Sequence, residues 1–183
     1  MKIALSHSAG LIKRFRRTPW RFQHTFVTPL KSLQPFVSTI ISTLQPLKSG
    51  AVTIDTVVFE PKHLLTLVAT DSSPQFVHDH TLSAVGADQT EALLRATLHD
   101  WIDFVFIPVP KPFAIYADHD EFCTFYAHSK SNLNRVVMPL SRLGFESTSS
   151  PTPRSMTPSN CLRSADSVRP SRCASARSLI FVT

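Results

Sequence analysis

The sequence predicts an α+β fold, a two-layer ββαββα-like sandwich with two helices on one face of a mostly antiparallel sheet. Two stretches of helical periodicity alternate with runs of β-branched and aromatic residues, and short connections join the paired runs. Hydrophobic residues make up 43% of the 183 residues, which is enough for the core of one domain. We therefore expect one compact domain, residues 51–146, with an extension on each side.

The first predicted hairpin joins residues 52–60 to residues 63–70. The run VTIDTVVFE is rich in β-branched residues, and only Pro61 and Lys62 separate it from the apolar run that follows. A short connection of this kind between two apolar runs is typical of a hairpin. Residues 71–87 are polar, and they predict a loop with one short strand.

The first predicted helix begins at Asp88 and ends by Ile107, before Pro108. Asp88 as N-cap and Glu91 three residues later form the pattern of a capping box. Proline ends the helix because it disfavours helical geometry in the residue before it. The apolar stripe of this helix consists of Leu94, Leu98, Trp101, Ile102 and Val105.

A second hairpin and a second helix complete the predicted domain. Residues 112–117 and 122–128 are strand-like and are joined by the four residues from Asp118 to Glu121. The helix covers residues 131–143, with Ser129 or Ser131 as its N-cap and Gly144 as its stop.

Two features of this part of the chain leave alternatives open. Pro139 lies inside the second predicted helix and should bend it. A βαβ arrangement, with residues 113–117 as a central parallel strand, is the alternative topology.

The basic residues are concentrated at the two ends of the chain. Residues 1–54 contain eight Lys or Arg and no acid, whereas residues 55–146 contain twelve acids and six Lys or Arg. We interpret residues 1–50 as a basic extension and linker. Residues 1–25 have the composition of a mitochondrial transit segment, so the predicted location is cytoplasmic or mitochondrial.

The basic extension also allows an interaction with nucleic acid, and this interaction would use only the basic residues of the segment 13–21. Trp20 within this segment and Phe22 directly after it would be available for stacking on bases. No apolar run approaches the roughly 18 residues of a membrane-spanning helix, so we expect a soluble chain without a transmembrane segment.

Residues 147–183 are rich in Ser, Pro and Arg and have almost no apolar periodicity. Such a segment cannot bury enough surface to offset its ordering entropy, so we expect a disordered tail that carries no site. The pattern up to Gly144 predicts that a strand follows, but the tail contains no strand-like run. We therefore expect the domain to lack its final strand. That would leave an open sheet edge near residues 113–127 and favour self-association.

The acidic middle of the chain contains the candidate catalytic and metal-binding residues. Asp118, His119 and Asp120 lie in one turn and could perform acid–base or metal chemistry. On a helix, His99 and Asp103 would be four residues apart and could hold one divalent metal together. A hairpin turn and a polar helix face explain the same residues without a site.

Two further groups complete the candidate residues. Lys130 and Ser131, at the start of the second predicted helix, could hold a phosphate. Cys123 lies within a strand and is expected in the core, because buried cysteine behaves as a small apolar residue. The three cysteines form no CxxC pair, and the chain has no P-loop, GxGxxG, HExxH or GxSxG motif.

From these residues we predict a small non-catalytic module that binds a protein partner or a small ligand. The alternative is a metal-dependent hydrolase that uses Asp118, His119 and Asp120, with help from His99 or Asp103. A divalent metal is the cofactor that this alternative requires.

Overall fold

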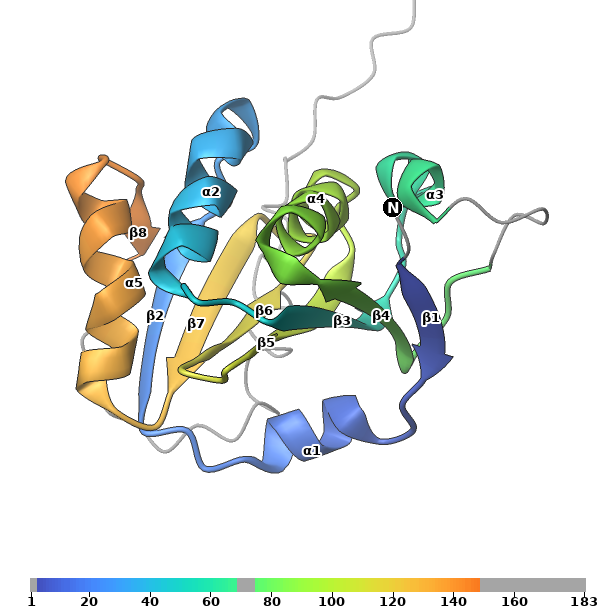
Figure 1. Cartoon of the computed structure of the whole chain (residues 1–183), viewed down its shortest axis with the longest axis horizontal. Coiled ribbons are helices and arrows are strands. Elements are labelled where there is room, and N and C mark those ends of the chain that lie inside the picture. Colours follow the sequence, from blue (N-terminus) through green and yellow to red (C-terminus); the bar gives the residue numbers. More distant parts are fainter. Residues whose placement is uncertain (1–2, 69–74, 149–183) are drawn as a thin grey trace, which may run out of the picture.

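The computed structural model describes residues 3–68 and 75–148, which form one eight-stranded antiparallel sheet with five α-helices (Figure 1). The strand order is β1-β4-β3-β5-β6-β7-β2-β8. The predicted α+β class and the antiparallel sheet are therefore confirmed. The strands are β1 (Ala4–His7), β2 (Phe22–Val27), β3 (Ser49–Thr56), β4 (His80–Val85), β5 (Asp103–Val109), β6 (Ala114–Ala117), β7 (Phe122–Ala127) and β8 (Ser147–Thr148).

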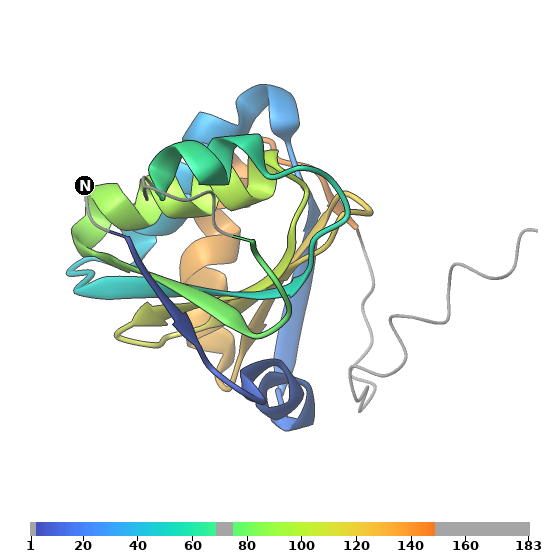
Figure 2. The same ribbon diagram turned by 90° about the vertical axis from the view of Figure 1, so that its right-hand side faces the viewer.

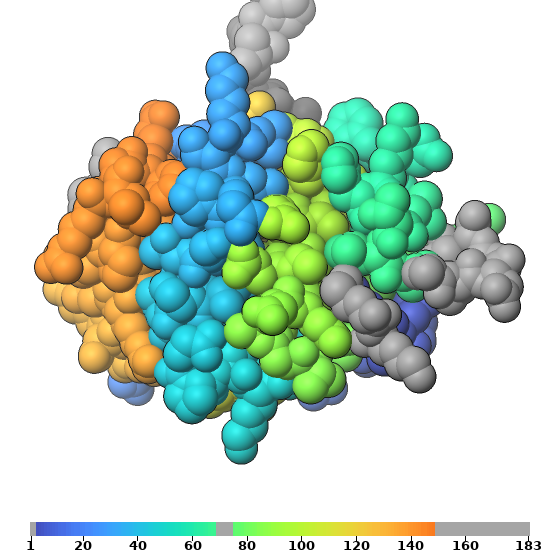
Figure 3. Space-filling view, turned by 45° about the horizontal axis from the view of Figure 1, so that its top comes forward, coloured from blue at the N-terminus to red at the C-terminus, as the bar shows by residue number. Residues whose placement is uncertain are grey.

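The helices lie on both faces of the sheet (Figures 1 and 2). One face is covered by α2, α3, α4 and α5, which lie side by side in the space-filling view (Figure 3). The other face carries α1 alone among the described helices. The helices are α1 (Leu11–Arg17), α2 (Leu33–Thr43), α3 (Lys62–Leu67), α4 (Gly86–His99) and α5 (Lys130–Arg142), and a 3-10 turn (Leu30–Ser32) precedes α2.

The main core lies between the sheet and its larger helical layer. Alternate residues of each strand point to the same face, so β3 contributes Val52 and Ile54 while β5 contributes Phe104 and Phe106. Gly50, on the same face of β3, lets α4 approach closely. A Cβ at this position would collide with Thr90 Cγ2 and lie 2.7 Å from Phe106 Cε2.

A smaller core lies under α1. Ile12 and Phe15 are 1% and 5% exposed and pack on Val105 and Ala114 of the sheet. These two helix residues are three positions apart, so they lie on one face of α1. Four of the other five residues of α1 are cations.

Residues 3–50 belong to the fold, where the sequence predicted an extension and linker. They form β1, α1, β2 and α2, and Phe26 and Phe36 are fully buried in the main core. The proline content suggested a linker, but Pro35 lies in the first turn of α2, where its missing N–H breaks no helical hydrogen bond. Since residues 3–25 are part of the sheet and its covering helix, the structure does not support the predicted transit segment.

The predicted hairpin of residues 52–60 with residues 63–70 is wrong. Residues 62–67 form α3, and β3 pairs instead with β4 and β5. Asp100 explains the helix, because its carboxylate accepts hydrogen bonds from the backbone N–H groups of His63 and Leu64 at 3.1 and 2.7 Å. These are N-terminal N–H groups that have no partner within the helix itself.

The first predicted helix is real but ends eight residues earlier than expected. α4 stops at His99, Trp101 has a positive φ of 55°, and β5 begins at Asp103. Val105 continues the helical spacing, but it lies in an apolar run rich in aromatic and β-branched residues, and pairing of β5 with β3 and β6 selects the strand.

The predicted capping box is also wrong. Val85 occupies the N-cap position of α4, without a side-chain capping bond. Glu91 instead accepts hydrogen bonds from Gln34 and Ser38 of α2.

The second hairpin and the last helix agree with the sequence. β6 and β7 pair antiparallel, with Ala117 opposite Cys123, so the alternative βαβ topology is wrong. Ser129 caps α5 by accepting a hydrogen bond from the backbone N–H of Asn132 at 3.2 Å, and Pro139 lies inside the helix.

The open sheet edge expected near residues 113–127 is not found. β6 lies between β5 and β7, and β7 is covered along its length by β2. A short strand does follow Gly144, because β8 pairs with Thr25 and Phe26 of β2. The prediction of a disordered tail falls almost entirely on residues 149–183, which lie outside the described residues.

Within residues 3–68 and 75–148, no helix combines the length and the apolar character that crossing a membrane requires.

Candidate functional site

The Asp118 carboxylate closes the β6–β7 turn. Its Oδ1 accepts hydrogen bonds from the backbone N–H groups of Asp120 and Phe122, each at 3.1 Å. Burial raises the pKa of Asp118 above its ordinary value. The geometry is that of an aspartate stabilising a turn, which is one of the common positions of this residue.

His119 is held by Asp103, at the start of β5. The Asp103 Oδ1 accepts the backbone N–H of His119 at 2.7 Å and lies 2.8 Å from its Nδ1. This hydrogen bond raises the pKa of His119. Asp120 is largely exposed, and its carboxylate lies 3.8 Å from His119 Nε2. The structure thus brings Asp103, His119 and Asp120 together.

The predicted pair of His99 and Asp103 is not formed. The reversal at Trp101 sends Asp103 to β5, while His99 remains the last residue of α4. His99 instead lies against His63 of α3, with ring centroids 3.9 Å apart. The sequence offered no local signal for this contact, because the residues around His63 resemble a strand.

Lys130 and Ser131 are exposed in the first turn of α5. The hydroxyl of Ser129 already accepts one of the free N–H groups of this turn. A helix N-terminus attracts anions, but nothing beyond the helix end distinguishes this position as a phosphate site.

Cys123 is fully buried within β7, as predicted. Burial strongly raises the pKa of its thiol, so the nucleophilic thiolate is disfavoured. Cys123 is a core residue.

Two buried carboxylates, Asp55 and Asp79, hold α1 on the sheet. Asp55 forms an ion pair with Arg16, in the last turn of α1, and accepts a hydrogen bond from the Tyr116 hydroxyl at 3.1 Å. Asp79 accepts the backbone N–H of Gly10, just before α1, at 2.8 Å. Both ends of α1 are therefore anchored.

Tyr116 of β6 lies beside the buried carboxylate of Asp55. Burial, together with the negative charge of Asp55, raises the pKa of Tyr116 far above its ordinary value. Tyr116 therefore stays a neutral hydroxyl that donates a hydrogen bond to the Asp55 carboxylate.

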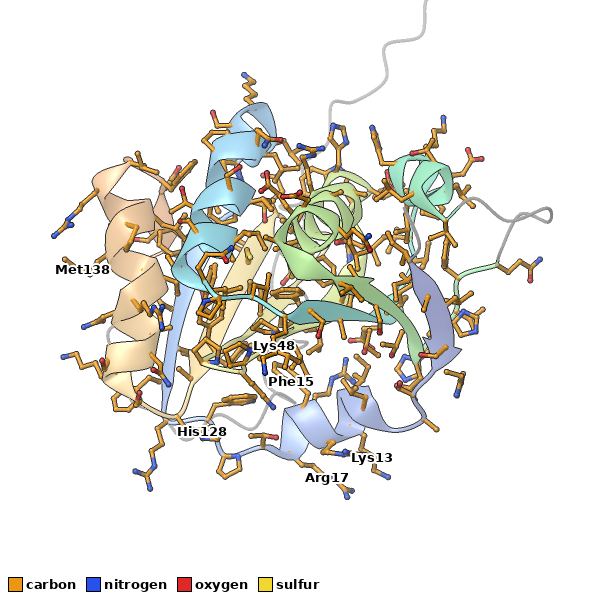
Figure 4. The ribbon with its side chains drawn as sticks, viewed as in Figure 1. Lys13, Phe15, Arg17, Lys48, His128 and Met138 are labelled. Carbon is orange, nitrogen blue, oxygen red and sulfur yellow. The ribbon has the colours of Figure 1, made fainter. Side chains whose placement is uncertain are left out.

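The outer side of α1 is strongly basic. We define the basic α1 surface as the exposed residues Lys13, Arg14, Arg17 and Arg21. Figure 4 shows Lys13 and Arg17 directed away from the sheet, whereas Phe15 is directed toward it. Arg16, the remaining cation of α1, forms an ion pair with Asp55.

Trp20 is packed beside this surface rather than free to stack on a ligand. Its ring stacks on His128 with a centroid distance of 4.7 Å, and its Nε1–H donates to the carbonyl of Phe15 at 3.2 Å. Lys111 Nζ lies 5.4 Å from the centroid of the same ring, a cation–π distance. Lys111 therefore adds a further exposed cation close to the basic α1 surface.

In comparisons with protein-family models, with curated proteins and with solved structures, no family, protein or structure matches this chain.

Proposed function

We propose that the protein is a non-catalytic binding module that contacts nucleic acid through the basic α1 surface. The observation that carries the proposal is the placement of three exposed cations, Lys13, Arg14 and Arg17, on one short helix that is anchored at both ends. Residues 1–54 contain no acid, and Asp55, which contacts α1, is already paired with Arg16. A cluster of fixed cations is the electrostatic footprint of a phosphate-binding surface.

The apolar side of α1 favours nucleic acid over a lipid bilayer as the partner. A helix that binds a membrane surface must bury its apolar face in the bilayer. Ile12 and Phe15 already pack on the sheet, so α1 would have to leave the fold to insert. A polyanion needs only the exposed cations.

The arrangement of the acidic turn supports a non-catalytic protein. The Asp118 carboxylate accepts hydrogen bonds from two backbone N–H groups of its own turn, and Asp103 accepts one from the backbone N–H of His119. Such contacts give these residues a structural role without any substrate.

The proposal is tested by fluorescence anisotropy of the full-length protein with a labelled single-stranded oligonucleotide over a series of salt concentrations. Replacing Lys13, Arg14 and Arg17 together by Gln should weaken binding. The slope of log K against log salt should also become shallower by about 2, since each phosphate contact on a single strand contributes about 0.7. The matched control replaces the exposed Lys31, Lys62 and Arg142 by Gln.

The control has the same net charge as the α1 variant, so it separates a site from an effect of overall charge. Equal losses in both variants would contradict the proposal, as would unchanged binding of the α1 variant. The second outcome would place any binding elsewhere, for instance in the five arginines of residues 147–183.

A metal-dependent hydrolase is the alternative, and one observation favours it. The bond between Asp103 and His119 is the carboxylate–imidazole pair that positions a general base. If this alternative holds, Mn²⁺-dependent hydrolysis of a chromogenic phosphate ester should fall with His119→Gln and with Asp118→Asn. Asp118→Asn keeps an oxygen that can close the turn, so a loss of activity would not follow from unfolding.

A further inference from the structure

We infer that His63 and His99 form a binding site for a divalent transition metal, such as Zn²⁺, at the junction of α3 and α4. His63, His99 and Asp100 each offer a ligand atom within 4.8 Å of the other two. Imidazole nitrogen suits Zn, Cu and Ni, whereas Mg and Ca prefer oxygen ligands. The site lies outside the surface proposed for nucleic acid, since α3 and α1 lie on opposite faces of the sheet (Figure 1).

Asp100 acts in this site as a positioning residue. Its Oδ1 lies 2.6 Å from His63 Nδ1 and also accepts the backbone N–H of His63, while its Oδ2 accepts that of Leu64. Both carboxylate oxygens are therefore occupied by α3. A carboxylate that holds Nδ1 fixes the ring and leaves Nε2 of His63 as the metal ligand.

The two imidazoles are both accessible and are held by separate elements. The His63 side chain is 51% exposed, and His99 is also exposed at the end of α4. Their ring centroids are 3.9 Å apart and the ring planes are tilted by 35°, so a shared ion requires the two side chains to turn until one nitrogen of each ring faces it. Leu64, next to His63, is fully buried, which fixes α3 beside α4.

The charge around the rings favours a cation. Asp100 is buried beside them and contributes one negative charge. Lys62 is the neighbouring cation, but its Nζ lies 3.8 Å from a carboxylate oxygen of Glu60. A metal would therefore bridge α3 and α4 at a position where a carboxylate already sets the orientation of one ligand.

The competing explanation is that Asp100 only caps α3 and that the two rings merely pack together. Capping alone predicts no saturable metal binding, and it predicts no role for His99, which makes no hydrogen bond to Asp100 in the described contacts. His99 therefore distinguishes the two explanations.

The test is a Zn²⁺ titration of metal-free full-length protein by calorimetry, with Co²⁺ absorption as the spectroscopic readout. We expect saturable binding of one ion per chain and a higher thermal midpoint in its presence. His99→Ala and His63→Ala should each abolish both effects. Asp100→Asn should bind 10–100-fold more weakly, the usual cost of losing the partner of a metal-bound histidine.

His7→Ala is the matched control, because His7 belongs to the other contacting histidine pair, with His80, at a centroid distance of 5.8 Å. It should leave Zn²⁺ binding unchanged. The inference is overturned if the wild type shows no saturable binding or if His99→Ala binds as the wild type does. Circular dichroism of His99→Ala checks that the variant is folded, and its exposed position at a helix end makes this the least disruptive substitution in the site.

Discussion

At the scale of single residues, two histidines respond to folding in opposite directions. His24 is half-buried against Phe26, at a centroid distance of 4.8 Å, and its Nε2 has no hydrogen-bond partner among the described residues. Burial lowers the pKa of His24 from its ordinary value of 6.5. The hydrogen bond to Asp103 instead raises the pKa of His119.

The stability of the protein should therefore carry an acid-sensitive contribution from His24. Below about pH 6.5 the unfolded chain takes up a proton at this residue that the folded chain resists, so this contribution falls as the pH decreases. We expect His24→Phe to lose less stability than the wild type between pH 7.5 and pH 5, as measured by urea unfolding.

His119→Gln provides the opposite comparison. A histidine with a raised pKa stabilises the fold at low pH, and the contribution is lost as the pH rises through the folded-state pKa. This variant should lose more stability than the wild type on acidification. If the free energy of unfolding changes with pH by the same amount in the wild type and in both variants, neither histidine contributes as described.

At the scale of elements, close contact between β3 and α4 depends on Gly50. The strand passes directly under Thr90 of the helix and beside Phe106 of β5, and there is no room for a methyl group. This contact fixes the position of α4 over the centre of the sheet. It also fixes the end of α4, where His99 meets α3.

Gly50→Ala should destabilise the protein by about 1–3 kcal/mol, the usual cost of overpacking a core. The measurement is chemical denaturation at neutral pH. Thr90→Ser removes the methyl group that would collide with the new Cβ, so the double variant should recover part of the loss. Full additivity of the two substitutions would contradict this account of the contact.

At the scale of the whole molecule, the chain crosses the sheet in an order far from its sequence order. β1 pairs with β4 at one end, and β2 pairs with β7 near the other, so the first 27 residues contact both ends of the sheet. α1 connects these strands across the second face. The N-terminal segment therefore connects the two ends of the sheet.

Deleting residues 1–21 should prevent stable folding. The deletion removes β1 and α1, exposes Val105 and Ala114, and takes away Arg16 from Asp55 and the Gly10 N–H from Asp79. Buried charges that lose a partner are strongly destabilising. Circular dichroism and a cooperative melt of the deleted protein provide the measurement.

A single-residue comparison accompanies this deletion. Arg16→Gln removes one of the two anchors of α1 but retains the helix, so it should lower the thermal midpoint without abolishing folding. A deleted protein that melts cooperatively at the wild-type temperature would show that β1 and α1 are dispensable, as the transit-segment prediction requires.

The sequence by itself determined the elements whose signals are local. The β6–β7 hairpin follows from two strand-like runs and the four residues between them, and α5 follows from an apolar stripe and a serine N-cap, for which the sequence offered Ser129 or Ser131. The α+β class and the core position of Cys123 follow from the same patterns. In each of these cases the stabilising contacts join residues close in the chain, or they require only burial.

Only the tertiary structure decided the elements whose partners are distant. Residues 62–67 form a helix because Asp100 caps it, and Asp103–Val105 leave the helical pattern because β3 and β6 pair with this part of β5. The anchoring of α1 joins Arg16 to Asp55, and the candidate metal site joins His63 to His99. Neither pair lies within one helix or one turn, so its formation depends on which strands pair and where each helix ends. Periodicity and local propensity do not contain that information.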